Sequence, residues 1–351
     1  MLSAIPPLVS VVMPVYNSAL YVAEAIASML NQTFKDFELL LFNDGSSDES
    51  IELIRGFTDA RIRLFDYAQN VGYVAHLNHA LEIARGTYIA RMDSDDVAHP
   101  DRLARQVALL ENHPEIGLCG TAYREFGGRE HLVRVPETDS EIRRWLLRSN
   151  PFGHPTVLMR KAVIAQHQLR YDPAAMPAED YRLWYEISRV TQLANLTEPL
   201  LAYRVHETQT SQVLAAKRQD SANETRRRQL LDHGFVLTPG EWEQYVRILD
   251  RSTRPRTAQD LHELLATAWS IARQNARLAA YPAAWFEDMF AEAWQDAVIA
   301  IGRHNWAYVQ PTLLMDKPFP NPLSKVAQLK LLVKCAVGWG VPGRSPSIPD
   351  A

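Results

Sequence analysis

The run Asp93-Ser94-Asp95-Asp96 is the densest group of chemically active side chains in the sequence. Several carboxylates in one place repel one another unless a cation offsets their charge. Hard oxygen ligands in this number suit Mg²⁺ or Mn²⁺, which usually complete their shell with water and substrate phosphates. The run therefore predicts a divalent-metal site that handles a diphosphate, with a solvated acidic turn as the alternative.

Asp44 follows an apolar segment and precedes a cluster of turn-forming residues. Its carboxylate could accept an N–H group from a base such as uracil, or it could cap the next helix. Asn70 and Gly72 form a second turn, and Asn78 falls on the helix that is expected after it. These polar residues are candidates for ligand binding, and turn formation is the alternative for each.

Alternating apolar strands and amphipathic helices must position these side chains. The strands are apolar on both faces, which is typical of a mainly parallel sheet covered by helices. Since parallel strands end at one edge, the acidic run and Asp44 should meet there. The expected strands cover residues 9–13, 38–42, 62–65 and 88–92, and the expected helices cover 22–30, 51–57 and 74–84, the last closed by Gly86 at its C-terminus.

Composition and charge exclude several classes of protein. The chain has 351 residues, a formal net charge of −4 and no strongly basic segment, so nucleic acid is not an expected partner. Its two cysteines, Cys119 and Cys335, have no metal-type spacing, which argues against a disulfide scaffold or a zinc site and favours a cytoplasmic location. No apolar run is long enough to span a membrane.

Four segments together resemble, in order, the motifs of family 2 glycosyltransferases. The motifs cover about the first hundred residues and comprise residues 10–17 (SVVMPVYN), 43–48 (NDGSSD), 70–72 (NVG) with 78–80 (NHA), and 88–96 (YIARMDSDD). The resemblance implies an α/β fold of the GT-A type, an NDP-sugar donor that is most often a UDP-sugar, and inversion at the anomeric carbon. It also implies a divalent metal, Mn²⁺ or Mg²⁺, with Asp95 as its ligand.

The resemblance also assigns residues to the nucleotide-sugar donor. Pro14, Val15, Tyr16 and Asp44 would hold the nucleoside, Glu24 would support the base or its loop, and Asp93 would contact the ribose or the sugar. The full set expected at the donor is Pro14, Val15, Tyr16, Asn17, Glu24, Asp44, Asn70, Gly72, Asn78, Arg91, Asp93, Ser94 and Asp95.

On the acceptor side, residues 177–184 (PAEDYRLW) look like the Glu-Asp motif of the family at the start of a helix. The resemblance makes Asp180 the catalytic base, with Glu179 as the second candidate and Trp184 near the acceptor. An inverting transfer needs one carboxylate to take the proton of the acceptor hydroxyl. The alternative is a pair of acids that complements the helix dipole.

Two histidines extend this assignment. Residues 150–160 are similar to the acceptor-side strand of the family, which places His154 near the acceptor. Residues 203–207 (YRVHE) resemble another family segment, in which His206 completes the metal shell or approaches the diphosphate. A structural hydrogen bond is the alternative for His206, and Arg204 could pair with a phosphate or with a carboxylate.

The resemblance and the change in composition predict the domain organisation. Residues 1–211 form the catalytic domain, with a nucleotide-sugar half at 1–110 and an acceptor-side half at 111–211. Long helical patterns rich in Arg, Gln, Ala and Trp predict a helical C-terminal domain at 212–342 and a flexible tail at 343–351. Trp285, Phe286, Phe290 and Trp294 are expected in the core of that domain, with an acceptor platform as the alternative.

One C-terminal helix raises the question of a membrane partner. Apolar residues fall on one face of this helix, at Val326, Leu329, Leu332, Val333, Ala336 and Val337. Lys325, Lys330 and Lys334 could meet anionic headgroups at the inner face of the cell membrane, and packing against the catalytic domain is the favoured alternative. Self-association into a homo-oligomer also stays open.

Other families fit the sequence less well. Residues 93–97 match a motif of haloacid-dehalogenase-like phosphatases, but that motif belongs on a first strand, and three strands precede it here. Residues 338–343 match Gly-x-Gly-x-x-Gly without a following βαβ unit, and no basic Gly-rich loop supports a nucleotidyltransferase. The resemblance to family 2 glycosyltransferases therefore implies a metal-dependent inverting glycosyltransferase that moves a sugar from an NDP-sugar to a glycan or lipid-linked acceptor in polysaccharide or glycoconjugate synthesis. A catalytically silent sugar-nucleotide-binding or scaffold protein is the alternative.

Overall fold

The computed structural model describes residues 6–128, 130–206, 209, 214–249, 258–299 and 317. The chain divides into two compact units, residues 1–226 and 227–351. The boundary that the sequence predicts, between residues 211 and 212, stays a prediction.

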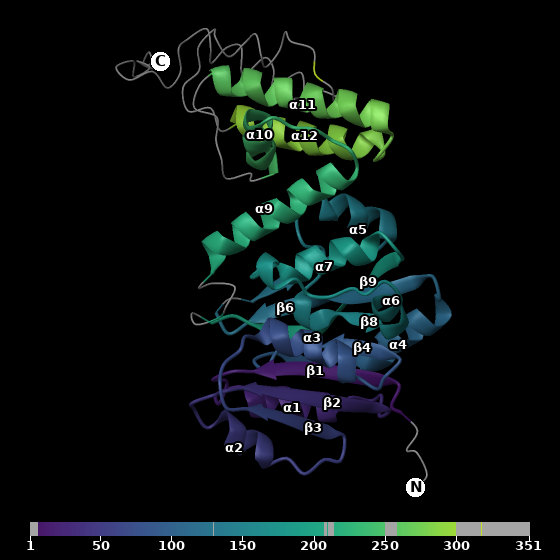
Figure 1. Ribbon diagram of the computed structural model, residues 1–351, viewed down its shortest axis with the longest axis vertical. Helices are drawn as coiled ribbons and strands as arrows, with labels where there is room; N and C mark the ends of the chain where they lie inside the picture. Colours follow the sequence, from purple (N-terminus) through teal and green to yellow (C-terminus); the bar gives the residue numbers. More distant parts are fainter. Residues whose placement is uncertain are drawn as a thin grey trace, which may run out of the picture. The chain divides into compact units, whose positions relative to one another are not determined.

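The first unit is built on one sheet with helices on both faces (Figure 1). Its strands are β1 (Val9–Val15), β2 (Phe37–Asp44), β3 (Ile62–Tyr67), β4 (Tyr88–Arg91), β5 (Val97–Ala98), β6 (Ile116–Phe126), β7 (His131–Val133), β8 (Leu158–Arg160) and β9 (Gln192–Arg204). Its helices are α1 (Val22–Leu30), α2 (Ser50–Arg55), α3 (Tyr73–Ile83), α4 (Arg102–Asn112), α5 (Asp139–Leu146), α6 (Lys161–Gln166) and α7 (Glu179–Ser188).

The strand order is β3-β2-β1-β4-β8-β6-β9-β5, with β7 paired to β6. Strands β1 to β4 are mutually parallel, and β9 is parallel to β6, whereas β8 runs antiparallel to both β4 and β6. The predicted α/β class with a mainly parallel sheet is confirmed. Because β8 is reversed, the residues that precede it lie at the same edge as the carboxyl ends of β1, β2, β4 and β9.

The core explains why the first strands are apolar on both faces. Val11 and Met13 on β1 are buried with α1 and α4, while Val12 is buried on the other face with α3 and α7. Successive side chains of a strand point to opposite faces, so a strand between two helical layers must be apolar throughout. The four predicted strands and the three predicted helices of this region are confirmed.

Gly86 has a different role from the one predicted. Helix α3 ends at Ile83 with Ala84 as its C-cap, so Gly86 does not close the helix. A Cβ atom on Gly86 would lie 2.6 Å from the backbone nitrogen of Ser10 on β1. Glycine is required here because the chain entering β4 passes directly against β1.

The second unit is helical in the part that the structure describes. It contains α10 (Pro239–Leu249), α11 (Ala258–Leu278) and α12 (Ala283–Ile299), and α9 (Ala215–Asp232) crosses the boundary between the units. Phe286, Phe290 and Trp294 on α12 are at most 1% exposed, so they are core residues and not an acceptor platform. Trp285 is half-buried.

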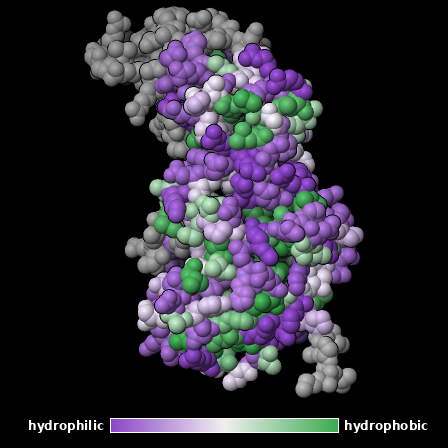
Figure 2. Space-filling view, in the orientation of Figure 1, coloured by the Kyte–Doolittle hydropathy of each residue, from purple (hydrophilic) through white to green (hydrophobic). Residues whose placement is uncertain are grey.

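Several predicted features lie outside the described residues, namely the lysine-bearing C-terminal helix, the glycine motif at 338–343, Cys335 and the tail at 343–351. Among the residues that the structure does describe, no helix is both long and apolar enough to cross a membrane. The face shown in Figure 2 is mainly hydrophilic over the described residues, with hydrophobic side chains in small groups.

Candidate functional site

Hydrogen bonds join the loops that follow β1, β2 and β4. The backbone N–H of Asn17 donates to Ser46 Oγ at 3.0 Å, and the N–H of Ser47 donates to Asn17 Oδ1 at 2.8 Å. Asn17 has a φ of 47°, a left-handed conformation that asparagine tolerates better than most residues. Ser18 Oγ lies 2.7 Å from Ser94 Oγ in the acidic run. The predicted donor segments are therefore held together at one edge.

Asp44 is turned into the protein. Its carboxylate accepts the backbone N–H groups of Val71 at 2.8 Å and Gly72 at 3.1 Å, and lies 2.7 Å from His76 Nε2. Asp44 is only 2% exposed. Both of its oxygens thus position the turn before α3, where Gly72 has a φ of 89°. A contact between Asp44 and the base of a nucleotide stays a prediction.

The other predicted donor residues differ in their exposure. Pro14 and Val15 are buried, so only their backbone could meet a ligand, whereas Tyr16 is 51% exposed and Asn70 is exposed. Asn78 exchanges two hydrogen bonds of 2.9 Å with the backbone of Tyr171. Its side-chain amide therefore ties α3 to the acceptor-side half of the chain.

Asp93, Asp95 and Asp96 form a cluster in which one carboxylate oxygen from each lies within 4.8 Å of the others. Burial raises the pKa of Asp95 and, more strongly, that of Asp96, and the charge of Asp93 raises both further. Asp96 is 0% exposed, and its Oδ2 has no hydrogen-bond partner among the described residues. A divalent cation would offset this repulsion, so the donor set fits Mn²⁺ or Mg²⁺.

Arg91 and His206 flank the cluster. Arg91, which is 5% exposed, forms an ion pair with Asp93, and His206 Nε2 lies 2.9 Å from Asp95 Oδ2. The structure thus brings the predicted metal residues Asp95 and His206 together. Asp96 was not among the predicted site residues, although its place in the acidic run was a signal for it.

Arg204, at the end of β9, connects Glu24 to the acidic loop. Its Nε donates to the backbone oxygen of Asp95 at 2.8 Å, and its guanidinium forms an ion pair with Glu24. The guanidinium lies over the rings of Tyr21 and Phe126, at 4.6 and 4.4 Å from their centroids. Of the phosphate and the carboxylate considered as partners for Arg204, the structure shows a carboxylate, that of Glu24.

The acidic pair at the start of α7 lies in two different environments. Glu179 is 2% exposed and accepts a hydrogen bond of 2.9 Å from the Tyr73 hydroxyl, while Asp180 accepts one of 2.7 Å from the Asn150 amide. Burial, with the Asp180 charge second, raises the pKa of Glu179 to about 7. Burial also raises the pKa of Asp180. Sequence reasoning missed Tyr73, which comes from a segment 106 residues away.

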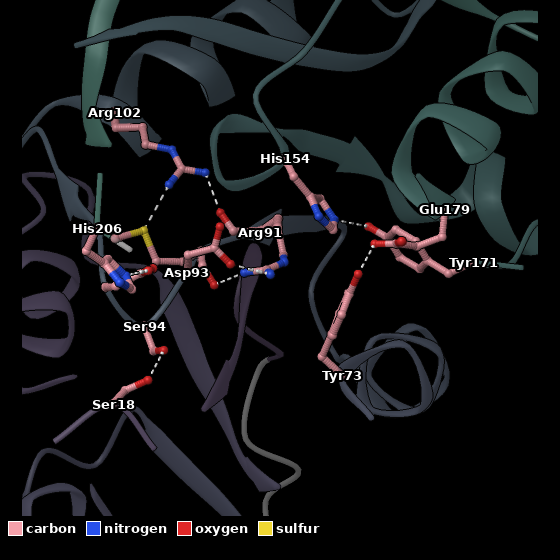
Figure 3. A network of polar contacts seen from close by, with 12 residues as sticks. Ser18, Tyr73, Arg91, Asp93, Ser94, Arg102, His154, Tyr171, Glu179 and His206 are labelled. Carbon is pink, nitrogen blue, oxygen red and sulfur yellow. Dashed lines mark hydrogen bonds and ion pairs between the residues drawn. The ribbon is translucent and has the colours of Figure 1, made fainter. Parts of the chain in front are cut away.

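His154 is neutral in this site. Burial, together with the charge of Arg91, lowers its pKa well below the usual value, and its Nε2 lies 3.3 Å from the Tyr171 hydroxyl. In Figure 3, Arg91 lies between Asp93 on one side and His154, Tyr171 and Glu179 on the other. Trp184 is 0% exposed, so it packs behind His154 and is not a contact surface for an acceptor.

Arg102 supports the acidic loop from within the protein. It is 0% exposed, and it donates to the backbone oxygen of Arg91 at 2.7 Å (Figure 3). It also donates to Gln106 Oε1 at 3.1 Å. Burial lowers its pKa to about 10, so it keeps its charge at neutral pH. The sequence pattern did not indicate this role, because a charged residue at a helix start is usually exposed.

Known proteins resemble the chain in sequence and in fold. The model of the family described as Glycosyl transferase family 2 matches residues 10–167. An uncharacterized glycosyltransferase of Haemophilus influenzae is 34% identical over 63% of this chain and 72% of its own length. The O-antigen biosynthesis glycosyltransferase WbnJ of Escherichia coli is 33% identical over 58% of this chain and 82% of its own.

Two solved structures have a similar fold at low sequence identity. TarS 1–349 of S. aureus, in complex with UDP-GlcNAc, has a TM-score of 0.56 at 16% identity and covers 82% of this chain and 88% of its own. The mannosyltransferase PcManGT from Pyrobaculum calidifontis, in complex with GDP-Man and Mn²⁺, has a TM-score of 0.51 at 18% identity, with 84% and 87% covered. The chain belongs to glycosyltransferase family 2, has a GT-A-like α/β fold, and is a glycosyltransferase.

Proposed function

We propose that this enzyme transfers a sugar, with inversion, from an NDP-sugar to an acceptor hydroxyl in a metal-dependent reaction. The observation that carries the proposal is the placement of Asp93 and Glu179 on opposite sides of Arg91 (Figure 3). Asp93 belongs to the acidic cluster, and Glu179 is followed directly by Asp180 in the sequence. The cluster suits a metal and a diphosphate, and the pair suits the proton of the acceptor. A donor and an acceptor bound on these two sides would meet between them.

Asp180 is the proposed catalytic base. Its carboxylate takes the proton of the acceptor hydroxyl while that oxygen attacks the anomeric carbon, and the bond to the diphosphate breaks with its electron pair leaving on the diphosphate. Asn150 orients Asp180 through its 2.7 Å hydrogen bond. Glu179 is buried and hydrogen-bonded to Tyr73, whereas Asp180 is half-buried, so an acceptor hydroxyl would reach Asp180 more easily.

Asp95 and His206 would hold the metal, with Asp93 and Asp96 beside them. When bound, Mn²⁺ or Mg²⁺ would neutralise charge on the leaving diphosphate. Arg91 keeps Asp93 in place through its ion pair, and Arg204 holds the backbone of Asp95. The Mn²⁺ in the PcManGT structure supports this part of the proposal.

The donor is proposed to be a UDP-sugar, and the acceptor a glycan or a lipid-linked glycan. The UDP-GlcNAc in the TarS structure supports a UDP-sugar. Because the PcManGT structure contains GDP-Man, GDP is also included in the binding test below. The O-antigen role in the name of the E. coli relative supports polysaccharide or glycoconjugate synthesis. We place the reaction in the cytoplasm, because the two cysteines do not suggest a disulfide scaffold.

Isothermal titration with UDP, GDP and dTDP, each with and without Mn²⁺, tests the proposal. One nucleotide should bind only with metal, and Asp95→Ala should abolish that binding. Asp180→Asn should keep the binding and lower the transfer rate by about 10²–10⁴-fold, the usual contribution of a general base. Glu82→Gln, which removes an exposed acid paired with Arg170, is the control and should change neither.

Two outcomes would contradict the proposal. If no nucleotide binds under any condition, the protein is better explained as a silent scaffold with the same fold. If Asp180→Asn turns over at the rate of the wild type, another group takes the proton, and Glu179→Gln becomes the next variant to measure.

A further inference from the structure

One face of helix α9 packs against the acceptor-side half of the first unit. Ser221 Oγ donates to the backbone oxygen of Met176 at 3.2 Å, and Ala222 packs against the core cluster that contains Trp184. Arg226 Nε donates to the backbone oxygen of Arg148 at 2.7 Å. The early part of α9 therefore runs beside the chain segment that leads into α7 (Figure 1).

Arg218 belongs to the same face of α9. With 3.6 residues per turn, residues three and four apart share a face, and the packed positions of α9 follow this spacing. The packed positions are Ser221, Ala222, Thr225 and Arg226, and Arg218 lies one turn before them on the same side of the helix. Thr225 and Arg226 are buried, but Arg218, at the N-terminal end of the face, is exposed.

The charge of Arg218 reaches the acceptor side of the site. Burial raises the pKa of Asp180, and the charge of Arg218 opposes that rise. Burial and the charge of Glu125 raise the pKa of Tyr123, the charge of Arg218 again opposes the rise, and the charges of Asp96 and Asp180 add to it. Tyr123 thus lies within electrostatic range of the metal cluster, the base and Arg218. Ser221, one turn along α9 from Arg218, contacts Met176, which lies four residues before Asp180. The packing of α9 thus places its first turns near the start of α7, and the effect of the Arg218 charge agrees with this placement.

The guanidinium of Arg218 has no hydrogen-bond or ion-pair partner among the residues described. Arg91 also acts on Asp180, but it is already paired with Asp93. A guanidinium can bind a phosphate or a carboxylate with two parallel hydrogen bonds. Arg218 therefore offers an anion-binding group at the place where the acceptor must present its hydroxyl to Asp180.

We propose that Arg218 binds an anionic group of the acceptor, so that the acceptor class is a glycan that carries a phosphate or a carboxylate near the attacking hydroxyl. The proposal rests on the proposed function, since it names the acceptor of the same site. The shared chemistry is a fixed anion, which a lipid-linked diphosphate or an acidic sugar would each supply.

Phosphate binding measured by ³¹P NMR provides the test. Inorganic phosphate is titrated into protein that is saturated with UDP and Mg²⁺, so that the donor diphosphate position is filled. Binding to the wild-type protein should broaden the phosphate signal. Arg218→Gln should raise the Kd for phosphate about tenfold, as expected for the loss of a charge-assisted hydrogen bond between arginine and phosphate. Arg227→Gln is the matched control, because Arg227 is exposed on the opposite side of α9.

Competition then separates the two sources of the anion. Displacement of phosphate by farnesyl diphosphate would indicate a lipid-linked diphosphate, and displacement by glucuronate would indicate an acidic sugar. The proposal is overturned if wild type binds no phosphate, if Arg218→Gln binds it as wild type does, or if Arg227→Gln weakens it equally. UDP affinity is measured in the same samples, so a failure of nucleotide binding is seen separately as a failure of the proposed function.

Discussion

Glu179 and Asp180 are adjacent in the sequence, yet their surroundings separate their chemistry. Glu179 is buried and accepts a hydrogen bond from Tyr73, whereas Asp180 is only partly buried and accepts a hydrogen bond from the Asn150 amide. Two coupled acids that cannot both ionise easily share their protons unequally. A proton that stays on Glu179 near neutral pH would leave Asp180 ionised and able to act as a base.

Glu179→Gln should change how stability depends on pH. The pKa of Glu179 is raised from its ordinary value to about 7, so between about pH 4.5 and 7 the folded protein binds more protons than the unfolded chain. The contribution of Glu179 to the free energy of unfolding therefore falls as the pH rises through that window. Glu179→Gln cannot titrate at this position, so it does not lose stability in this way. The melting temperature of Glu179→Gln relative to wild type should rise by a few degrees from pH 5 to pH 7.5.

Thermal melts across this pH range measure the effect. Glu82→Gln is again the control, because the Glu82 side chain is 59% exposed. The melting temperature of this variant should change with pH in the same way as that of wild type. If the melting temperatures of Glu179→Gln and wild type differ by the same amount across this pH range, the pKa of Glu179 is not raised in the folded protein and the prediction is wrong.

At the scale of elements, the end of β9 holds the acidic loop. Strand β9 pairs with β5, which follows the acidic run directly, and the backbone N–H of Arg204 donates to Asp96 Oδ1 at 2.8 Å. The Arg204 side chain then reaches the backbone of Asp95 and the carboxylate of Glu24 on α1. One arginine thus joins three elements around the cluster.

Arg204→Ala should therefore weaken metal-dependent nucleotide binding without removing any proposed metal ligand. Losing two ring contacts and the hydrogen bond to Asp95 should lower the free energy of unfolding by about 1–3 kcal/mol. The looser loop should raise the Kd for the nucleotide with Mn²⁺ by about tenfold, measured by isothermal titration.

Arg55→Ala is the control for this variant. Arg55 forms an ion pair with Asp66 in which both side chains are exposed, so its loss should cost less than about 1 kcal/mol. An Arg204→Ala protein that binds the nucleotide as tightly as wild type would show that the loop keeps its geometry without this contact.

At the scale of the whole molecule, the proposed site lies within the first compact unit. Loops after β1 and β4 and the end of β9 supply the residues of the metal and donor side, and all of them lie in residues 1–226. A ligand that binds the folded state stabilises the structure around its site.

Hydrogen exchange with and without nucleotide and Mn²⁺ should map this stabilisation. Amides of residues 15–18, 93–96 and 204–206 should exchange more slowly in the complex. Those of α10 and α11 should exchange at unchanged rates. Asp95→Ala should show no difference on addition of the ligands, and equal protection of α10 and α11 would contradict a site confined to the first unit.

By itself, the sequence determined the alternation of strands and helices in the first hundred residues and the place of the acidic run. Strands buried on both faces need apolar residues throughout, and helices need apolar residues every three or four positions, so these elements are visible in one dimension. The convergence of Asp93 and Asp95 with the loop after β1 followed from the rule that parallel strands end at one edge.

Only the tertiary structure decided which side chains meet across that edge. Glu24 contacts Arg204 from 180 residues away, Tyr73 contacts Glu179 from 106 residues away, and Asp44 is turned toward His76. Such contacts depend on how helices pack on the sheet and on the reversed direction of β8, and local patterns do not encode either one. The chemistry of the site was therefore visible in the residue types, whereas its partnerships arise from packing.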